Sequence, residues 1–335
     1  MESASIWLWI GFNVFVLALL AFDLGILHKK KREIGVREAL YLSAFYFVLA
    51  MIFNAGIFYY MGSQKGYEFL TGYLIEKSLS LDNIFVFVLI FTHFQVPPQF
   101  QHRVLFWGIL GALVMRATLI FTGAALINTF DWIVFVFGAF LIFTGVKMLY
   151  AINEEPDLEN NRVMQLAKRI WRVTPNFEGE KFFVIKNGVR YATPLFLVLL
   201  LIEFSDLVFA IDSIPAIFAI TQDPFIVYTA NVFAILGLRA LYFALAGIIN
   251  KFYYLKYGLS LVLLIVGTKM ILNGIYGEKV IPVEWALVVT ASLIGGSMLL
   301  SLWKGREAGT PGTWVPGSPP KPKSAKADAR EEARR

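Results

Sequence analysis

The sequence predicts an all-α fold: a polytopic membrane helix bundle of about nine spans that contains an inverted repeat of two three-helix units. Hydrophobic residues make up 58% of the 335 residues and the mean hydropathy is +0.65, which is too apolar for an ordinary soluble domain. Apolar runs of about 20 residues, the length that crosses a bilayer, recur along the chain. Two stretches of the chain also carry the same polar landmarks in the same order.

Nine apolar runs are long enough to be membrane spans. The first run has no basic region before it and no small-residue cleavage site after it, so we expect it to remain as a span and not to be removed as a signal peptide. The runs cover residues 6–27, 39–61, 69–93, 104–127, 132–150, 193–219, 225–248, 256–274 and 283–303.

Basic residues predict how the chain is oriented in the membrane. The strongest basic flanks are the loop HKKKRE after the first run and the tail after the ninth, and an odd number of spans puts both on one side. The positive-inside rule places that side in the cytoplasm and the N-terminus outside, in what we expect to be a bacterial inner (plasma) membrane. The net charge of +6 is explained by this orientation, so no nucleic-acid partner is expected.

The longest connection between spans, residues 151–192, reads as a small folded cytoplasmic insert. Val163, Leu166, Ile170 and Val173 recur at helical spacing, and FFVI-KNG-VRYA has the Asn-Gly turn of a hairpin. The next two residues, Thr193-Pro194, predict a cap and a first-turn proline for the sixth span. From residue 309 onward the composition is typical of disorder.

An internal repeat emerges when the chain is aligned on itself. EKSLSLDN at 76–83 superposes on DLVFAIDS at 206–213, which matches an acid with an acid at both ends of a six-residue interval. Arg116 in ILGALVMRA then corresponds to Arg239 in ILGLRA, and GVKM at 145–148 corresponds to GTKM at 267–270. An odd number of spans in each unit forces the two copies into opposite orientations, as in many secondary transporters.

The chain therefore divides into six predicted segments. Residues 1–68 hold two N-terminal spans, 69–150 the first repeat unit, 151–192 the insert, 193–274 the second repeat unit, 275–303 the last span, and 304–335 a disordered basic tail.

Carboxylates inside apolar runs are the strongest functional signal. Each costs roughly 2.5–3.5 kcal/mol at mid-membrane on insertion scales, so such groups are expected to bind something. On ideal helices Glu76, Ser80 and Asn83 share one face, as do Glu203 and Asp206. Pro215 is expected to free the carbonyl of Ile211 beside Asp212. The predicted metal-site residues are Glu76, Asp82, Asn83, Glu203, Asp206 and Asp212.

An all-oxygen lining of this kind suits hard divalent ions such as Mn²⁺, Ca²⁺ or Mg²⁺. The chain has no cysteine, and its three histidines lie at span ends or in loops, which disfavours softer metals. We therefore expect no resident cofactor, only a transported divalent cation, with the lipid bilayer and a possible second copy of the chain as partners.

A plainer explanation of the acids is that they pair with bases inside the membrane. Four are available as charge partners: Arg116, Arg239, Lys147 and Lys269. The two interpretations are compatible, because an exporter must neutralise its carboxylates after the ion leaves, with bases or with protons. Asp23, near the basic end of the first span, is either where the ion enters or a simple end-pairing residue.

At EKSLSLDN, EFSDLVFAIDSIPAIFAI and NVFAILGLRALYF the chain resembles the TerC family of integral membrane proteins, which includes the alkaline-induced Alx proteins. The resemblance covers residues 21–302. It implies Mn²⁺ export, an association with tellurium resistance and pH stress, and a functional centre formed by the acids of the two repeated helices together with Asn83.

The function predicted from these observations is the export of a divalent cation, Mn²⁺ first, through a carboxylate site at the middle of the membrane, with possible coupling to protons. Two other transport or binding functions stay open: a Ca²⁺ or cation–proton exchanger, and a non-transporting membrane organiser in metal, tellurite or pH stress. An intramembrane aspartyl protease is disfavoured, because the Gly-x-Gly-Asp context is absent. We therefore expect no enzyme activity.

Overall fold

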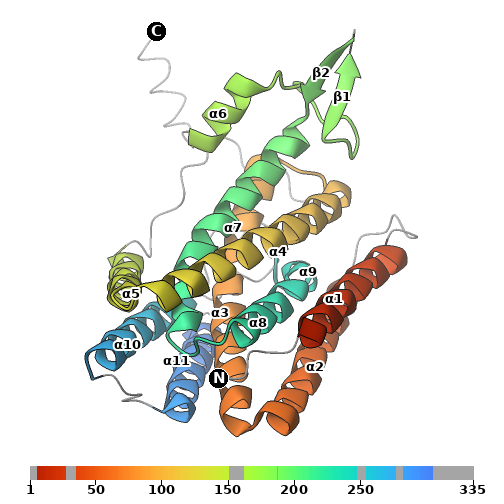
Figure 1. The fold of residues 1–335 in the computed structure, drawn as a ribbon. Helices are drawn as coiled ribbons and strands as arrows, with labels where there is room; N and C mark the ends of the chain where they lie inside the picture. The colour runs from red at the N-terminus through yellow and green to blue at the C-terminus, as the bar shows by residue number, and fades with distance from the viewer. Residues whose placement is uncertain are drawn as a thin grey trace.

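A computed structural model of the chain describes residues 6–27, 35–150, 162–186, 188–246, 254–276 and 282–304. In these ranges the chain is a bundle of helices with one short hairpin at one end, which confirms the predicted all-α class (Figure 1). The bundle helices are α1 (Ile6–Leu27), α2 (Val36–Met61), α3 (Ser63–His93), α4 (Pro98–Thr129), α5 (Ile133–Tyr150), α7 (Pro194–Phe218), α8 (Pro224–Leu236), α9 (Leu238–Leu245), α10 (Leu255–Tyr276) and α11 (Val283–Lys304).

Every predicted apolar run corresponds to a helix or to a pair of helices. The seventh run forms two, α8 and α9, because the helix is interrupted at Gly237. In the described ranges, seven segments are long and apolar enough to cross a membrane; α3, which carries five charged residues, is not among them. The number of nine crossings and the basic tail, which lies outside the described residues, stay predictions.

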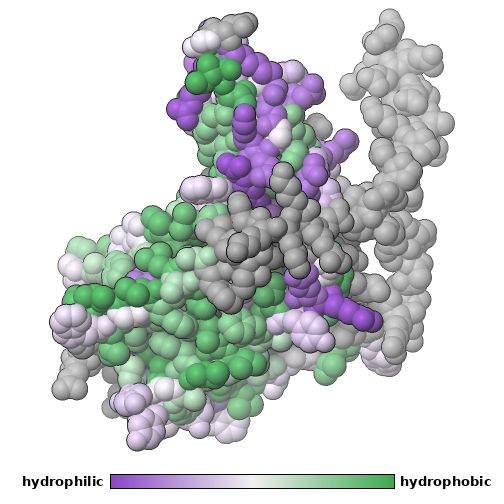
Figure 2. Space-filling view, turned by 90° about the vertical axis from the view of Figure 1, so that its right-hand side faces the viewer, coloured by the Kyte–Doolittle hydropathy of each residue, from purple (hydrophilic) through white to green (hydrophobic). Residues whose placement is uncertain are grey.

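Helix α8 lies at the centre of the bundle. Almost all of the α8–α9 segment is buried inside the protein, and α3 and α4 pack on it (Figure 1). Helices α2 and α5 instead bury only about a fifth of their apolar segments (22% each). Figure 2 shows apolar surface over the bundle and hydrophilic surface gathered at one end. A charged side chain near α8 is therefore held in protein and not exposed to lipid.

Helices α5 and α10 make the most extensive helix–helix contact in the described part of the chain, and glycines permit it. A Cβ on Gly267 would lie 2.8 Å from the carbonyl oxygen of Gly138, and a Cβ on Gly145 would lie 3.0 Å from that of Ser260. Under the offset of 122 residues between the two units, Gly145 corresponds to Gly267 and Gly138 corresponds to Ser260. The two glycine contacts are therefore equivalent positions of the repeat. Packing of α4 on α7 is similarly matched by packing of α3 on α8. This is the pattern that the predicted inverted repeat would produce.

The insert forms a helix, α6 (Arg162–Ile170), and an antiparallel hairpin of β1 (Phe183–Lys186) and β2 (Val189–Ala192), which confirms the predicted hairpin. Its turn includes Gly188 at φ +76°, a conformation that glycine adopts without strain. The predicted face of α6 is wrong in part, because Leu166 and Ile170 are exposed while Met164 and Ala167 are buried. The reason is that α6 packs on α7, so the residues of α6 that face α7 are the ones that become buried.

One expectation about α7 is also corrected. Thr193 precedes the helix as predicted, but its hydroxyl donates to the carbonyl oxygen of Lys181 (2.7 Å) instead of capping a helix N–H. Pro215 lies inside α7, which continues to Phe218, and the freed carbonyl of Ile211 stays a prediction.

A polar group of side chains, called here the Glu68 cluster, joins the start of α3 to the turn between α7 and α8. It consists of Lys65, Glu68, Thr221 and Asp223. The Lys65 ammonium lies 3.1 Å from a carboxylate oxygen of Glu68 and 3.0 Å from one of Asp223. The Thr221 hydroxyl donates to the buried Glu68 carboxylate at 2.6 Å. These contacts hold the two acid-bearing helices together at this end of the bundle.

Asp223 has a second role, because its carboxylate accepts from the Phe225 N–H and caps α8. We expect Asp223→Ala to lower the free energy of unfolding by about 1 kcal/mol more than Asp223→Asn does, since asparagine keeps the cap. The lost ion pair with half-exposed Lys65 adds at most about 1 kcal/mol in both variants. Thermal unfolding in detergent measures both, and equal losses would contradict the capping role.

A candidate ion site between helices α3, α4 and α7

One arginine holds the two acids that the sequence repeat makes equivalent. Arg116, from α4, is buried and forms an ion pair with Glu76 of α3. Its guanidinium also binds Asp206 of α7 through two nitrogens, at 3.0 and 3.2 Å. A buried carboxylate is stable only when it is paired and hydrogen-bonded, and Arg116 meets this need for both acids.

Two amides complete this network. The Asn83 side chain of α3 donates to Asp206 at 3.3 Å, and the Asn231 side-chain oxygen of α8 accepts from Arg116 at 3.3 Å. Asn83, Asn231 and Asp206 are all buried. The network therefore joins α3, α4, α7 and α8 at the middle of the bundle.

Three buried oxygens, two of them on side chains of this network, have no hydrogen-bond partner within the described part of the chain. They are one carboxylate oxygen of Glu76, the side-chain oxygen of Asn83 and the hydroxyl oxygen of Ser213. An unpaired buried polar atom costs roughly 1–3 kcal/mol, so such atoms are normally satisfied by water, by an ion or by another conformation. Carboxylate, amide and hydroxyl oxygens are the ligands that hard divalent cations take.

The other predicted acids do not join this group. Glu203 faces α4, as Asp206 does, but it lies outside the Arg116 network; its carboxylate lies against Gly111 of α4, where a Cβ would collide with it. Asp212 of α7 accepts from the Thr144 hydroxyl of α5 at 3.3 Å, in the electrostatic field of Lys147. The side chains of Asp82 and Asp23 lie outside the described residues. Among described residues no three Asp, Glu or His side chains form a metal-binding group, because separate helices take up these acids.

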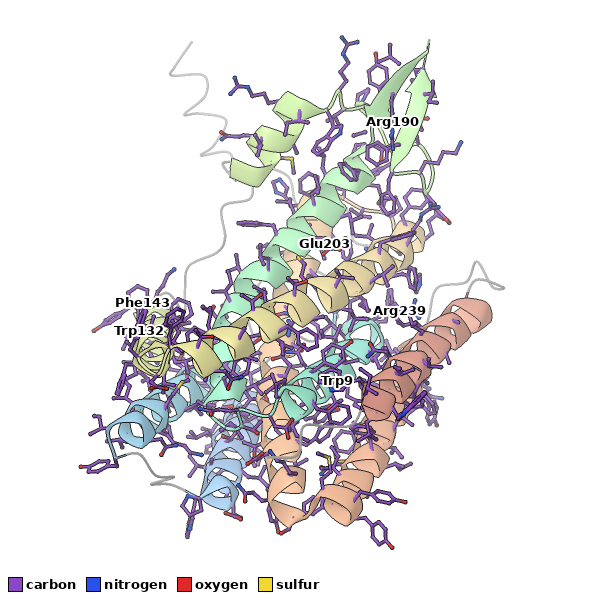
Figure 3. All side chains as sticks on the ribbon, viewed as in Figure 1. Trp9, Trp132, Phe143, Arg190, Glu203 and Arg239 are labelled. Atoms are coloured by element: carbon purple, nitrogen blue, oxygen red, sulfur yellow. The ribbon has the colours of Figure 1, made fainter. Side chains whose placement is uncertain are left out.

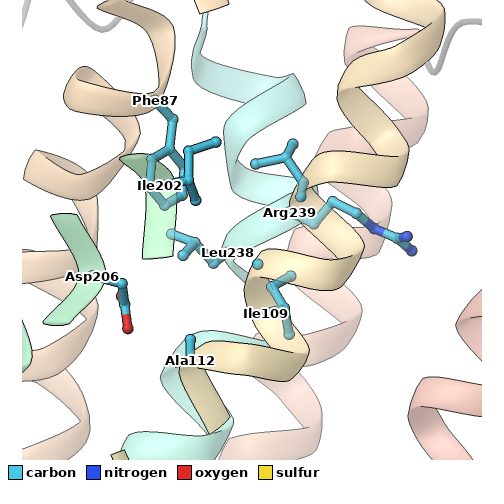
Figure 4. A pocket seen from close by; sticks show the side chains of 9 residues that line it. Phe87, Ile109, Ala112, Ile202, Asp206, Leu238 and Arg239 are labelled. Atoms are coloured by element: carbon cyan, nitrogen blue, oxygen red, sulfur yellow. The ribbon is translucent and has the colours of Figure 1, made fainter. Parts of the chain in front are cut away.

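The predicted bases also differ in placement. Arg116 pairs with the two central acids, while Arg239 and Lys269 are buried elsewhere and Lys147 is exposed on α5. Figure 3 shows Glu203 and Arg239 on different helices of the bundle. Arg239 lines a small cavity with Asp206, between apolar residues of α3, α4, α7 and α9 (Figure 4).

The sequence profile of the integral membrane protein TerC family matches residues 61–308. The chain belongs to that family. It is 54% identical over 303 residues to an uncharacterized membrane protein of Myxococcus xanthus, covering 90% of this chain and 94% of the relative. It is 45% identical over 305 residues to Alx of Escherichia coli strain K12, which is described as a candidate membrane-bound redox modulator, covering 88% of this chain and 94% of the relative. No solved structure gives a significant match.

Two contacts of this TerC-family chain were not predicted from its sequence. Asn231, which binds Arg116, stands alone as an amide in the apolar run of α8, and that isolation is a signal that could have found it. Lys77, next to Glu76, donates to the Ala234 carbonyl at 3.4 Å and lies beside Gly237, where a Cβ would be 2.7 Å from its nitrogen. Its charge thus complements the C-terminal end of α8.

Proposed function

We propose that this TerC-family protein exports a divalent cation, Mn²⁺ in the first place, through the site between α3 and α7. The observation that carries the proposal is a set of buried oxygens without a hydrogen-bond partner among the described residues: one each of Glu76 and Asn83, which belong to the Arg116–Asp206 network, and the Ser213 hydroxyl on the same helix as Asp206. A hard cation would satisfy these atoms and add the charge that two carboxylates need. Softer metals have no thiolate to bind, because the 335 residues contain no cysteine.

Arg116 gives the site a resident positive charge when no cation is bound. For a cation to reach both acids, the guanidinium must move away from at least one of them, because like charges repel strongly at such distances. Ion binding and a change in the packing of α4 against α3 and α7 are therefore coupled. The outward direction of transport is part of the proposal; the predicted orientation only places both basic flanks in the cytoplasm.

The Alx name of the Escherichia coli relative describes a redox modulator. Without cysteine, this chain cannot act by thiol exchange. An effect on redox state through the Mn²⁺ content of the cell is compatible with export. A Ca²⁺ exchanger and a non-transporting organiser are the alternatives, and the experiment below separates them from Mn²⁺ export.

Binding is measured by thermal unfolding of the purified protein in detergent with Mn²⁺, Ca²⁺, Mg²⁺ or Zn²⁺. A cation that binds only the folded state at 100 times its dissociation constant adds about 2.7 kcal/mol of stability. We expect Mn²⁺ to stabilise most. Ser213→Ala should leave the metal-free stability nearly unchanged, because its hydroxyl has no partner within the described part of the chain, while weakening Mn²⁺ binding at least about tenfold.

Transport is measured as the Mn²⁺ content of cells that express the wild type, Glu76→Gln or Asp131→Asn. Asp131 is an exposed acid between α4 and α5, so its variant is a matched control that keeps export. Glu76→Gln removes a central charge, and its cells should retain Mn²⁺ as cells without the protein do. Export by a well-inserted Glu76→Gln variant would refute the proposal, and stabilisation by Ca²⁺ alone would favour the exchanger.

A further inference from the structure

The two arginines that the sequence repeat makes equivalent have different roles in this structure. Arg116 of the first unit binds both central acids, Glu76 and Asp206. Arg239 of the second unit is also buried, but its guanidinium points away from Asp206. In an inverted repeat the two units exchange conformations when the protein changes the side to which its site opens. An asymmetry between equivalent residues in one state is therefore expected to be reversed in the other.

Arg239 shares a cavity with one of the two acids, Asp206. Its side chain and Asp206 line the same small cavity, whose walls include Ile109 and Ala112 of α4 and Ile202 of α7. Figure 4 shows the guanidinium of Arg239 directed away from Asp206, with the aliphatic part of the side chain facing the cavity. Rotation about the side-chain bonds would turn the guanidinium toward Asp206, because the two side chains line one cavity.

The amide and hydroxyl neighbours of the acids repeat the same asymmetry. Asn83 of the first unit donates across to Asp206 of the second, at 3.3 Å. Its equivalent 130 residues later is Ser213, and the equivalent of Asp206 is Glu76. Within the part of the chain that the structure describes, the Ser213 hydroxyl and one Glu76 oxygen are both buried without a hydrogen-bond partner. These are the two atoms that the exchanged state would pair.

We propose that Arg116 and Arg239 alternate as the resident counter-charge of Glu76 and Asp206. Arg116 holds the acids in the state seen here, and Arg239 crosses the cavity to hold them in the opposite-facing state, in which Ser213 donates to Glu76. Between the two, both arginines withdraw and the cation of the proposed function occupies the site. Arg239 is thus a positioning residue that determines which state the empty protein adopts. The inference rests on the proposed function for its cargo but not for its test.

The structure also identifies which end of the bundle is closed in the Arg116 state. The Glu68 cluster ties α3 to the α7–α8 turn at one end. The cavity beside Arg239 lies toward the other end, because Ile109 and Ala112 precede Arg116 in α4 and Ile202 precedes Asp206 in α7. Withdrawal of Arg116 should therefore favour opening of the end that carries the Glu68 cluster.

Cysteine labelling tests the exchange, and the absence of native cysteine leaves no background. One reporter is Ala219→Cys, a buried position after α7 at the Glu68-cluster end; the other is Ala112→Cys in the cavity. Each is combined with Arg116→Gln or Arg239→Gln, and the rate of labelling by a water-soluble maleimide is measured in liposomes without metal. A charge pair that exists in one state alone biases the equilibrium by its full interaction free energy, so shifts of at least about tenfold are expected.

The expected result is a pair of opposite changes. Arg116→Gln raises labelling of Ala219→Cys and lowers that of Ala112→Cys, and Arg239→Gln does the reverse. An increase at both reporters in both variants would mean general loosening and would overturn the exchange, as would no change from Arg239→Gln. Arg116→Lys and Arg239→Lys, which keep the charge, give smaller shifts in the same directions and cover the case in which a glutamine variant fails to fold. Because no metal is present, failure of Mn²⁺ binding leaves this result intact, and failure here leaves the Mn²⁺ result intact.

Discussion

Replacing Arg116 with methionine is expected to lower the free energy of unfolding by about 3–5 kcal/mol, the usual cost of removing one partner of a buried ion pair. The loss is large because Glu76 and Asp206 would be left together, buried and without a counter-charge. Thermal or denaturant unfolding in detergent, with the yield of folded protein, is the measurement.

A triple variant is the control for this prediction. Combining Arg116→Met with Glu76→Gln and Asp206→Asn removes all three charges, and replacing a buried ion group as a whole is often neutral. We expect the triple variant to regain most of the lost stability. If the single and triple variants are equally unstable, Arg116 contributes by packing and not by neutralising the acids.

Gly267→Ala is expected to destabilise the protein by about 1–3 kcal/mol, the usual cost of overpacking. The new Cβ would lie 2.8 Å from the Gly138 carbonyl oxygen and 2.9 Å from the Cβ of Leu141, and the backbone oxygen cannot move without shifting α5. Thermal unfolding in detergent gives the difference from wild type.

Gly295→Ala in α11 is the matched control, because nothing lies within 4 Å of a Cβ there. The same substitution should be neutral or stabilising by up to about 1 kcal/mol, since alanine favours helix. Gly267→Ala should therefore be clearly less stable than Gly295→Ala. Loss of stability in both would indicate that helix association is sensitive to any added methyl group and not to the α5–α10 contact.

The sequence predicted the local features of this protein well. Runs of apolar residues determine helices in a membrane because no other structure satisfies the backbone there, so all nine runs correspond to helices. The hairpin followed from the Asn-Gly turn between short alternating strands. Acids inside these runs were correctly singled out as the unusual groups, and family membership followed from the same motifs.

Other features depended on contacts between helices. Glu203 and Asp206 both face α4, yet only Asp206 binds Arg116 while Glu203 lies against Gly111, and the packing of α4 on α7 decides this difference. The break at Gly237 and the reach of Lys77 to Ala234 likewise involve α3 and α8 packed together.

The sequence by itself determined that this chain is a TerC-family bundle of membrane helices with carboxylates and arginines inside it. Only the tertiary structure decided which arginine meets which acid, and that oxygens of Glu76, Asn83 and Ser213 are buried without a hydrogen-bond partner among the described residues. The physical reason is the distance along the chain over which each kind of interaction acts. Helix formation depends on neighbours within a few residues, whereas a charge inside a membrane is satisfied by whatever group a distant helix brings within about 4 Å.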